Sequence, residues 1–106
     1  MEQENLPLEI TIHSDADNSM SVNISINGDL SFATVPVAYE QTKDSFANEQ
    51  NIQVDLNKVQ RADSSAMALI LEWYRLAKEY NAKFYLLNIP PILKNIARVT
   101  DLEELL

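Results

Sequence analysis

The sequence predicts a single α/β domain with a mixed β-sheet, in which an N-terminal hairpin adds to parallel strands and helices pack mainly on one face. Three observations predict this class. Short segments alternate apolar and polar residues, a long segment after residue 63 has helical periodicity, and a further strand and helix follow it. A chain of 106 residues can form one hydrophobic core and is too short for two ordinary domains. We therefore expect one domain over residues 1–106.

The N-terminal part of the chain predicts a β-hairpin. Residues 8–12 and 22–26 alternate apolar and polar side chains with a period of two, as half-buried strands do. Residues 14–19 between them are rich in Ser, Asp and Asn, whose side chains bond nearby backbone groups, so they predict the hairpin loop. Gly28 is the only glycine. It follows the second strand, where the chain must bend, and a positive φ angle is expected there.

The remaining strands and the flanking helices follow from periodicity and proline positions. Residues 37–48 are compatible with a helix, and Pro36 suits its first turn. Residues 51–56 alternate again, and residues 83–87 form a short apolar strand before the proline pair at 90–91 begins a last helix. Because a long helix joins these two strands, we expect them to be parallel neighbours in one sheet.

The long helix, at about residues 64–80, carries apolar residues on two sides. The predicted core face comprises Ala66, Leu69, Ile70, Trp73, Leu76, Ala77 and Tyr80. The opposite side comprises Met67, Leu71 and Tyr74, flanked by Ser64, Ala68 and Arg75. One helix rarely buries both sides in a two-layer domain, so we expect this second face to be exposed and to bind a protein partner, with Tyr74 as its aromatic anchor. The alternative is that a neighbouring loop or the last helix covers Met67, Leu71 and Tyr74 as a second core.

Composition excludes several classes of function. Sixteen acidic residues against eight basic ones give a formal charge of −8, which disfavours binding to nucleic acid or to anionic lipid surfaces. No apolar run reaches the length of a membrane span, and residues 1–5 do not resemble a secretory signal, so we expect a cytoplasmic protein without membrane insertion. The absence of cysteine excludes disulfides and thiol chemistry.

The sequence offers no set of residues for catalysis. His13 is the only histidine and has no cysteine or second histidine to bind a metal with it. The acidic pairs at 15 and 17 and at 103–104 lack calcium-loop spacing. Ser64 and Ser65 have neither a nucleophile-elbow motif nor a credible base, and no glycine-rich loop could hold a nucleotide. We expect no enzyme activity, no metal and no cofactor.

Asp63, Ser64 and Ser65 stand together before the long helix as three candidate N-caps. One interpretation is that Asp63 and Ser64 only cap the helix, which contributes about 1 kcal/mol. Another is that this turn is a docking or modification site. The helix N-terminus tolerates negative charge, so a phosphate on Ser64 or Ser65 is compatible with the fold, and it would block docking onto an apolar interface.

The order of elements and the residues at their junctions resemble the STAS family, which includes bacterial anti-sigma factor antagonists and MlaB-type accessory subunits of lipid ABC transporters. The resemblance runs from about residue 21 to residue 106. The sequences that carry it are Gly28-Asp29-Leu30, Ile52-Gln53-Val54-Asp55-Leu56, Asp63-Ser64-Ser65-Ala66, Leu86-Leu87-Asn88-Ile89-Pro90 and Ala97-Arg98-Val99-Thr100-Asp101-Leu102. It implies a STAS-like fold that acts by binding a protein partner.

The two subfamilies imply different roles for adjacent serines. In anti-sigma antagonists a serine at the position of Ser65 is phosphorylated, whereas MlaB-type subunits dock onto the transporter ATPase with a small hydroxyl residue at the position of Ser64. Ala66 stands where antagonists usually have glycine, which favours the MlaB-type interpretation.

The main functional prediction is therefore a non-catalytic subunit that docks onto the cytosolic ATPase of an MlaFEDB-like phospholipid-transporting ABC complex. Such a subunit lies at the inner membrane through the complex and contributes to outer-membrane lipid asymmetry. The predicted partner-binding residues are Ser64, Met67, Ala68, Leu71, Tyr74 and Arg75. The alternative is an anti-sigma factor antagonist that binds an anti-sigma kinase and is phosphorylated on Ser65, with Ser64 as the second candidate.

Overall fold

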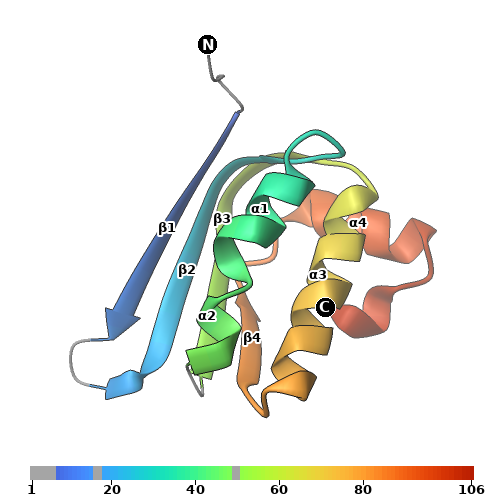
Figure 1. Cartoon of the computed structure of the whole chain (residues 1–106). Helices are drawn as coiled ribbons and strands as arrows, with labels where there is room; N and C mark the ends of the chain where they lie inside the picture. The colour runs from blue at the N-terminus through green and yellow to red at the C-terminus, as the bar shows by residue number, and fades with distance from the viewer. Residues whose placement is uncertain (1–6, 16–17, 49–50) are drawn as a thin grey trace.

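A computed structural model of the chain describes residues 7–15, 18–48 and 51–106 and has the predicted mixed α/β architecture (Figure 1). The elements in chain order are β1 (Leu8–Asp15), β2 (Asn18–Leu30), α1 (Val35–Thr42), α2 (Ser45–Asn48), β3 (Asn51–Ala62), α3 (Ser65–Glu79), β4 (Lys83–Leu87), α4 (Pro91–Val99) and the 3₁₀ turn η1 (Glu103–Leu105). β1 and β2 pair as the predicted hairpin; residues 16–17 of its loop lie outside the described residues.

The four strands form one sheet in the order β1-β2-β3-β4, with β1 antiparallel to β2 and the other pairs parallel. The register places apolar residues side by side: Ile10 pairs with Ile26, Ile24 with Val54, and Val54 with Leu86. Because side chains alternate along a strand, these residues share one face. The opposite face carries mostly polar residues: Thr11, Asn23, Ser25, Asn27, Gln53 and Asp55, with Tyr85 and Leu87 on β4.

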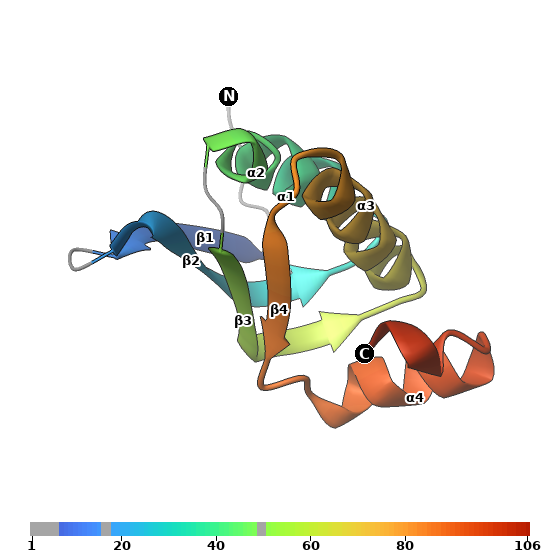
Figure 2. The ribbon, with the colours of Figure 1, turned by 90° about the horizontal axis from the view of Figure 1, so that it is seen from below.

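The helices bury the apolar face of this sheet. Figure 2 shows α1, α2 and α3 together over the sheet, and α4 beside the end of β3 and near the start of α3. Trp73 of α3 is fully buried, as predicted, and its ring centre lies 6.0 Å from that of Phe84. Phe84 in turn packs against Phe46, with the ring centres 5.7 Å apart. Ala66, Leu69, Ile70 and Ala77 are also buried, which confirms most of the predicted core face of α3. Tyr80 is the exception, since it follows the last turn of α3 and is 46% exposed.

Several predicted boundaries are wrong. The second strand was predicted over residues 22–26, whereas β2 spans Asn18–Leu30, so Gly28 lies within the strand and does not follow it. β3 continues to Ala62, whereas the alternation predicted its end at Leu56. The pairing with β2 continues past this point through register irregularities, so that Gly28 pairs with Val59 and Leu30 with Ala62. Such bulges break the period of two on which the prediction depended. The helix predicted from Val37 begins at Val35, and it is followed by the separate short helix α2.

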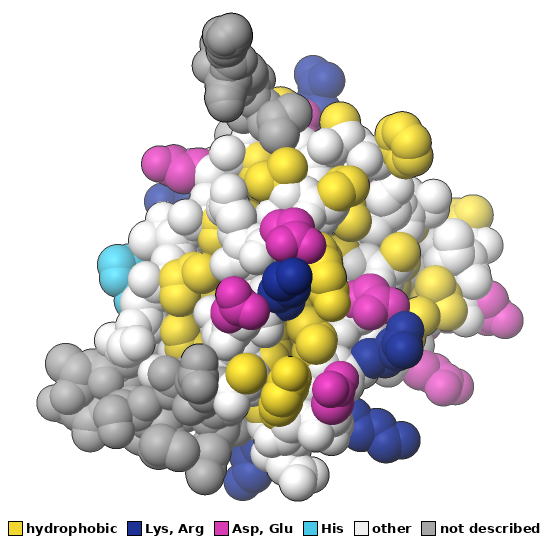
Figure 3. Space-filling view, viewed as in Figure 1, with side chains coloured by type: hydrophobic (Ala, Val, Ile, Leu, Met, Phe, Trp, Pro, Cys, Tyr) yellow, Lys and Arg dark blue, Asp and Glu magenta, His cyan; other side chains and the backbone are white. Residues whose placement is uncertain are grey.

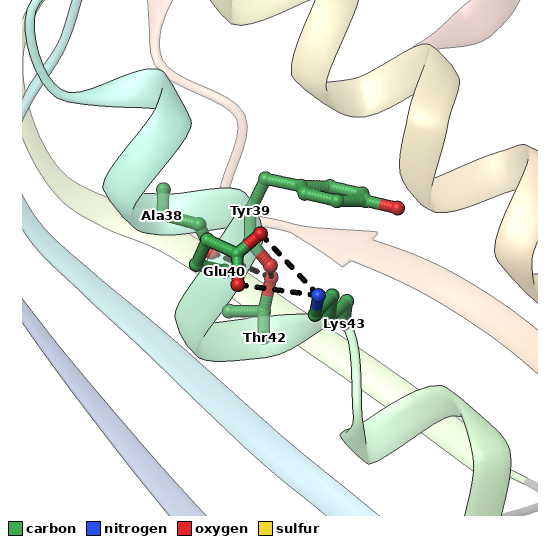
Figure 4. Close-up of polar contacts among 5 residues, drawn as sticks. All are labelled: Ala38, Tyr39, Glu40, Thr42 and Lys43. Carbon is green, nitrogen blue, oxygen red and sulfur yellow. Dashed lines mark hydrogen bonds and ion pairs between the residues drawn. The ribbon is translucent and has the colours of Figure 1, made fainter.

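Thr42 at the end of α1 joins this helix to the core. Its hydroxyl donates to the carbonyl oxygen of Ala38 at 2.7 Å and accepts a hydrogen bond from the indole Nε1 of Trp73 at 2.9 Å. Figure 4 shows the first of these contacts together with the exposed pair between Glu40 and Lys43, at 3.2 Å. Thr42 is fully buried, and its hydroxyl satisfies the only polar atom of the Trp73 side chain.

Gly28 has the special backbone conformation that its position predicts. Its φ angle is +120°, and a Cβ atom there would lie 2.1 Å from the carbonyl oxygen of Pro7. The same carbonyl accepts a hydrogen bond from the backbone N–H of Asp29 at 2.7 Å. Glycine therefore allows the chain before β1 to approach the end of β2 closely.

Candidate functional site

The start of α3 is organised by the carboxylate of Asp63. Its Oδ1 accepts the backbone N–H of Ser65 at 2.8 Å, and its Oδ2 accepts the backbone N–H of Phe32 at 2.9 Å. The backbone N–H of Asp63 donates in turn to the carbonyl oxygen of Leu30. One side chain thus caps α3 and also holds the loop between β2 and α1. The capping interpretation is confirmed for Asp63, whereas Ser64 makes no side-chain capping bond.

These bonds change the acidity of Asp63. The hydrogen bond from Phe32 lowers the pKa of Asp63 below its usual value, and the bonds from Ser65 act in the same direction. Desolvation opposes the shift. The carboxylate is therefore charged at neutral pH, at the end of the helix where negative charge is favourable.

The outward side of α3 carries four of the predicted residues in one line. We call this row, which consists of Ser64, Ala68, Leu71 and Arg75, the α3 stripe. All four side chains are exposed, Leu71 by 44%. Their spacing of four, three and four residues follows the helical repeat. Arg75 at its end pairs with Glu72 on the same helix at 2.8 Å.

The expected exposure of the other two predicted residues is not found. Met67 is 2% exposed, so the expectation that it lies bare is wrong. Tyr74 is half-buried: its hydroxyl donates to the carbonyl oxygen of Leu105 at 2.7 Å, and its ring meets Phe84 edge-to-face at 4.9 Å between centres. Burial raises the pKa of Tyr74. Leu105, beyond β4, thus covers Tyr74, which is the alternative that the sequence left open for this residue. Met67 is buried in the core as well.

Two shallow grooves flank the first half of the α3 stripe. The groove between α3 and α4 has a volume of about 290 Å³ and is lined by Ser64, Asn95, Ile96, Val99 and Thr100. The groove between α1 and α3 has a volume of about 280 Å³ and is lined by Val35, Pro36, Tyr39, Ala68, Leu69 and Glu72. Figure 3 shows hydrophobic side chains alternating with acidic and basic ones over α1 and α3. In Figure 4 the ring of Tyr39 extends from α1 on the side of α3.

Two residues that the sequence did not single out stand near the start of α3. Phe32, in the loop held by Asp63, is 83% exposed, and Val99, which lines the groove with Ser64, is 82% exposed. An aromatic residue within the turn-forming sequence Ser31-Phe32-Ala33-Thr34 is the signal that could have identified Phe32. Val99 has no comparable signal, because it also fits the end of an amphipathic helix.

Ser65, the predicted phosphorylation site, is the first residue of α3 and is half-buried. His13 is exposed on β1. Among the described residues, no three His, Cys, Asp or Glu side chains gather where they could hold a metal ion. No helix in the described part of the chain is both long and apolar enough to cross a membrane.

Comparison with known proteins adds to this geometry. A family model described as Mlab, STAS domain, matches residues 13–106. The search of curated proteins found no match.

Solved structures with a similar fold include two of SpoIIAA and one of another anti-sigma factor antagonist. SpoIIAA, an anti-sigma factor antagonist, in its unphosphorylated form has a TM-score of 0.69 at 18% identity, over 89% of this chain and 84% of that one. SpoIIAA from Bacillus in its phosphorylated form has a TM-score of 0.66 at 18% identity, over 89% and 86%. An anti-sigma factor antagonist from Mycobacterium paratuberculosis has a TM-score of 0.67 at 22% identity, over 91% and 81%. At these identities the likeness establishes the fold.

Proposed function

This chain belongs to the STAS family, and from that membership we propose that it docks, without catalysis, onto the cytosolic ATPase of a phospholipid-transporting ABC complex. In this role it stabilises the assembly or the active state of the ATPase. It lies at the cytoplasmic face of the inner membrane through the complex and contributes to outer-membrane lipid asymmetry. The α3 stripe carries the proposal, because it is an exposed row of small and apolar side chains that ends in Arg75 on a folded helix.

The stripe has the composition of a docking face. Ser64 and Ala68 are small and allow the close approach of a partner helix or loop. Leu71 offers an apolar side chain, and completing its burial would contribute about 1 kcal/mol. Met67 and Tyr74 belong to the same predicted set, and we assign them the role of supporting α3 from inside the fold, because neither is fully accessible.

The mechanism is binding energy that acts on the conformations of the partner. A subunit that binds one state of an ATPase more tightly than another shifts the equilibrium toward that state by the difference in affinity. Two features favour a transporter ATPase over a kinase as the partner. The matching family model is of the Mlab type, and Ala66, where antagonists usually have glycine, is fully buried in the core.

The test is the affinity of the purified chain for its ATPase, measured with variants of the stripe. Leu71→Asp and Ser64→Glu each place a charge in the proposed interface, and we expect each to weaken binding at least about a hundredfold. Leu87→Asp is the matched control, because Leu87 lies on the opposite face of the sheet and is 37% exposed. Undiminished binding by folded Leu71→Asp protein would contradict the proposal.

A second function is favoured by one specific observation. Ser65 begins α3 in a fold like that of SpoIIAA, of which unphosphorylated and phosphorylated forms are among the similar structures. Under this alternative an anti-sigma kinase phosphorylates Ser65, and only the unmodified chain binds that kinase. Affinity purification followed by mass spectrometry distinguishes the two. An ABC ATPase with unmodified serines supports the transporter function, whereas a kinase with phosphate on Ser65 supports the antagonist.

A further inference from the structure

Phe32 and Val99 differ from the other apolar residues of the surface. They expose 83% and 82% of their area, whereas the other exposed large apolar side chains among the described residues lie between 37% and 46%. Figure 1 shows the loop before α1, the start of α3 and helix α4 at the same, upper end of the molecule. The two bare side chains therefore belong to segments that converge where the α3 stripe begins.

The backbone that carries Phe32 is fixed. Asp63 accepts the N–H of Phe32, and Thr34, which is fully buried, donates its hydroxyl to the carbonyl oxygen of Asp29 at 2.6 Å. The same hydroxyl of Thr34 accepts the N–H of Ser31 at 2.9 Å. Hydrogen bonds thus fix the backbone around Phe32. A partner that binds Phe32 does not have to order this loop, so the entropic cost of binding is smaller.

Two carboxylates flank this end of the molecule. Asp63 and Asp101 are both exposed, and neither takes part in the ion pairs found in the described part of the chain. Asp63 adjoins Ser64, and Asp101 follows Thr100; Ser64 and Thr100 both line the groove between α3 and α4. Arg61 and Arg98 are also exposed, close in the sequence to these two carboxylates. The chain as a whole carries a net charge of −8, however, so a partner that approaches the apolar anchors meets a negative overall field. The complementary surface is apolar with cationic residues at its edge.

From these observations we infer that Phe32 is a specificity-determining anchor of the docking surface, held by Asp63, and that it enters an apolar pocket of the partner rimmed by Lys or Arg. This inference rests on the proposed function, since the partner is the transporter ATPase. It adds a contact outside α3, and it assigns Asp63 as the positioning residue of that contact.

The first experiment compares the affinity of Phe32→Ala with that of the unsubstituted chain for the purified ATPase. Loss of an aromatic anchor is expected to weaken binding at least about tenfold. Tyr85→Ala is the matched control, because Tyr85 is a 45% exposed aromatic residue on the opposite face of the sheet, and its affinity should not change. Equal affinities for Phe32→Ala and the unsubstituted chain overturn this inference and leave the proposed function intact. Failure of the unsubstituted chain to bind overturns both.

The second experiment tests the charge of the partner surface. Binding by the unsubstituted chain should weaken as ionic strength rises from about 0.05 to about 0.5 M. Asp101→Asn removes a charge without touching the Phe32 loop, so it should make this dependence shallower. Asp63→Asn should also make the salt dependence shallower. In addition it should weaken binding at high salt, because an asparagine side chain has one acceptor oxygen and cannot hold both the Phe32 loop and the start of α3. An affinity that does not vary with salt overturns the cationic rim. Urea unfolding of each variant verifies that it is folded.

Discussion

At the scale of single residues, the side chain of Asp63 forms a hydrogen bond with Phe32, which lies thirty-one positions earlier in the chain. One carboxylate oxygen of Asp63 accepts the N–H of Ser65 at the start of α3, and the other accepts the N–H of Phe32 in the loop before α1. The sequence predicted only the bond at the start of α3. An N-cap can be predicted because it involves neighbours in the chain. The bond to Phe32 could not be predicted, because it depends on how the ends of β2 and β3 lie together in the sheet.

The lowered pKa of Asp63 predicts how its contribution depends on pH. A carboxyl group whose pKa is lower in the folded state stabilises the fold above its unfolded pKa of about 4, and this stabilisation is lost as pH falls through the folded pKa. We expect Asp63→Asn to lower the free energy of unfolding by about 0.5–1 kcal/mol at neutral pH. The difference from the unsubstituted chain should shrink at about pH 3.

Urea unfolding at both pH values measures this difference, and Asp101→Asn controls for the loss of a negative charge elsewhere. A gap between Asp63→Asn and the unsubstituted chain that stays constant from neutral pH to about pH 3 would mean that the carboxylate bonds do not stabilise the fold.

At the scale of elements, the strands were predicted where alternation is regular and missed where it fails. β1 and β2 follow the period of two, and β4 was predicted from a short apolar run. The second half of β3 does not alternate, because bulges shift its register against β2. α3 was predicted in full from its helical repeat. The break between α1 and α2 leaves no comparable pattern in a segment whose periodicity is weak.

The close approach of Gly28, near the end of β2, to the chain just before β1 gives a prediction at this scale. Gly28→Ala introduces a Cβ atom at the backbone of Pro7 and forces an unfavourable φ angle. We expect a loss of about 1–3 kcal/mol in the free energy of unfolding, measured in urea. Asn27→Ala, one residue earlier in the same strand, should cost less. If Gly28→Ala were as stable as the unsubstituted chain, the close approach to Pro7 would not hold in solution.

At the scale of the whole molecule, the mixed sheet and its helix-covered face were predictable, and the number of sides on which α3 packs was not. The apolar residues of α3 indicated two faces but did not show that the segment after β4 returns to cover one of them. Tyr74 is half-buried for this reason, and Met67 is buried in the core. Of the predicted partner-binding residues, Ser64, Ala68, Leu71 and Arg75 keep the predicted exposure.

The contact between α3 and the C-terminal residues can be tested at Tyr74, whose hydroxyl donates a hydrogen bond to Leu105. Tyr74→Phe keeps the ring against Phe84 and removes the hydrogen bond to Leu105, so we expect a loss of about 0.5–1.5 kcal/mol in the free energy of unfolding. Binding to the ATPase should be unchanged. Tyr85→Phe, at an exposed tyrosine, is the control for the hydroxyl alone. A loss of affinity without a loss of stability would instead return Tyr74 to the interface.

The buried hydrogen bond between Thr42 and Trp73 has a practical consequence. Trp73 is the only tryptophan of the chain, it is fully buried, and it is on the inner side of the same helix whose outer side bears the α3 stripe. Its fluorescence therefore reports the packing of α1 against α3. A substitution on the stripe that leaves this emission unchanged can be interpreted as a change in binding, because the core beneath it has kept its structure.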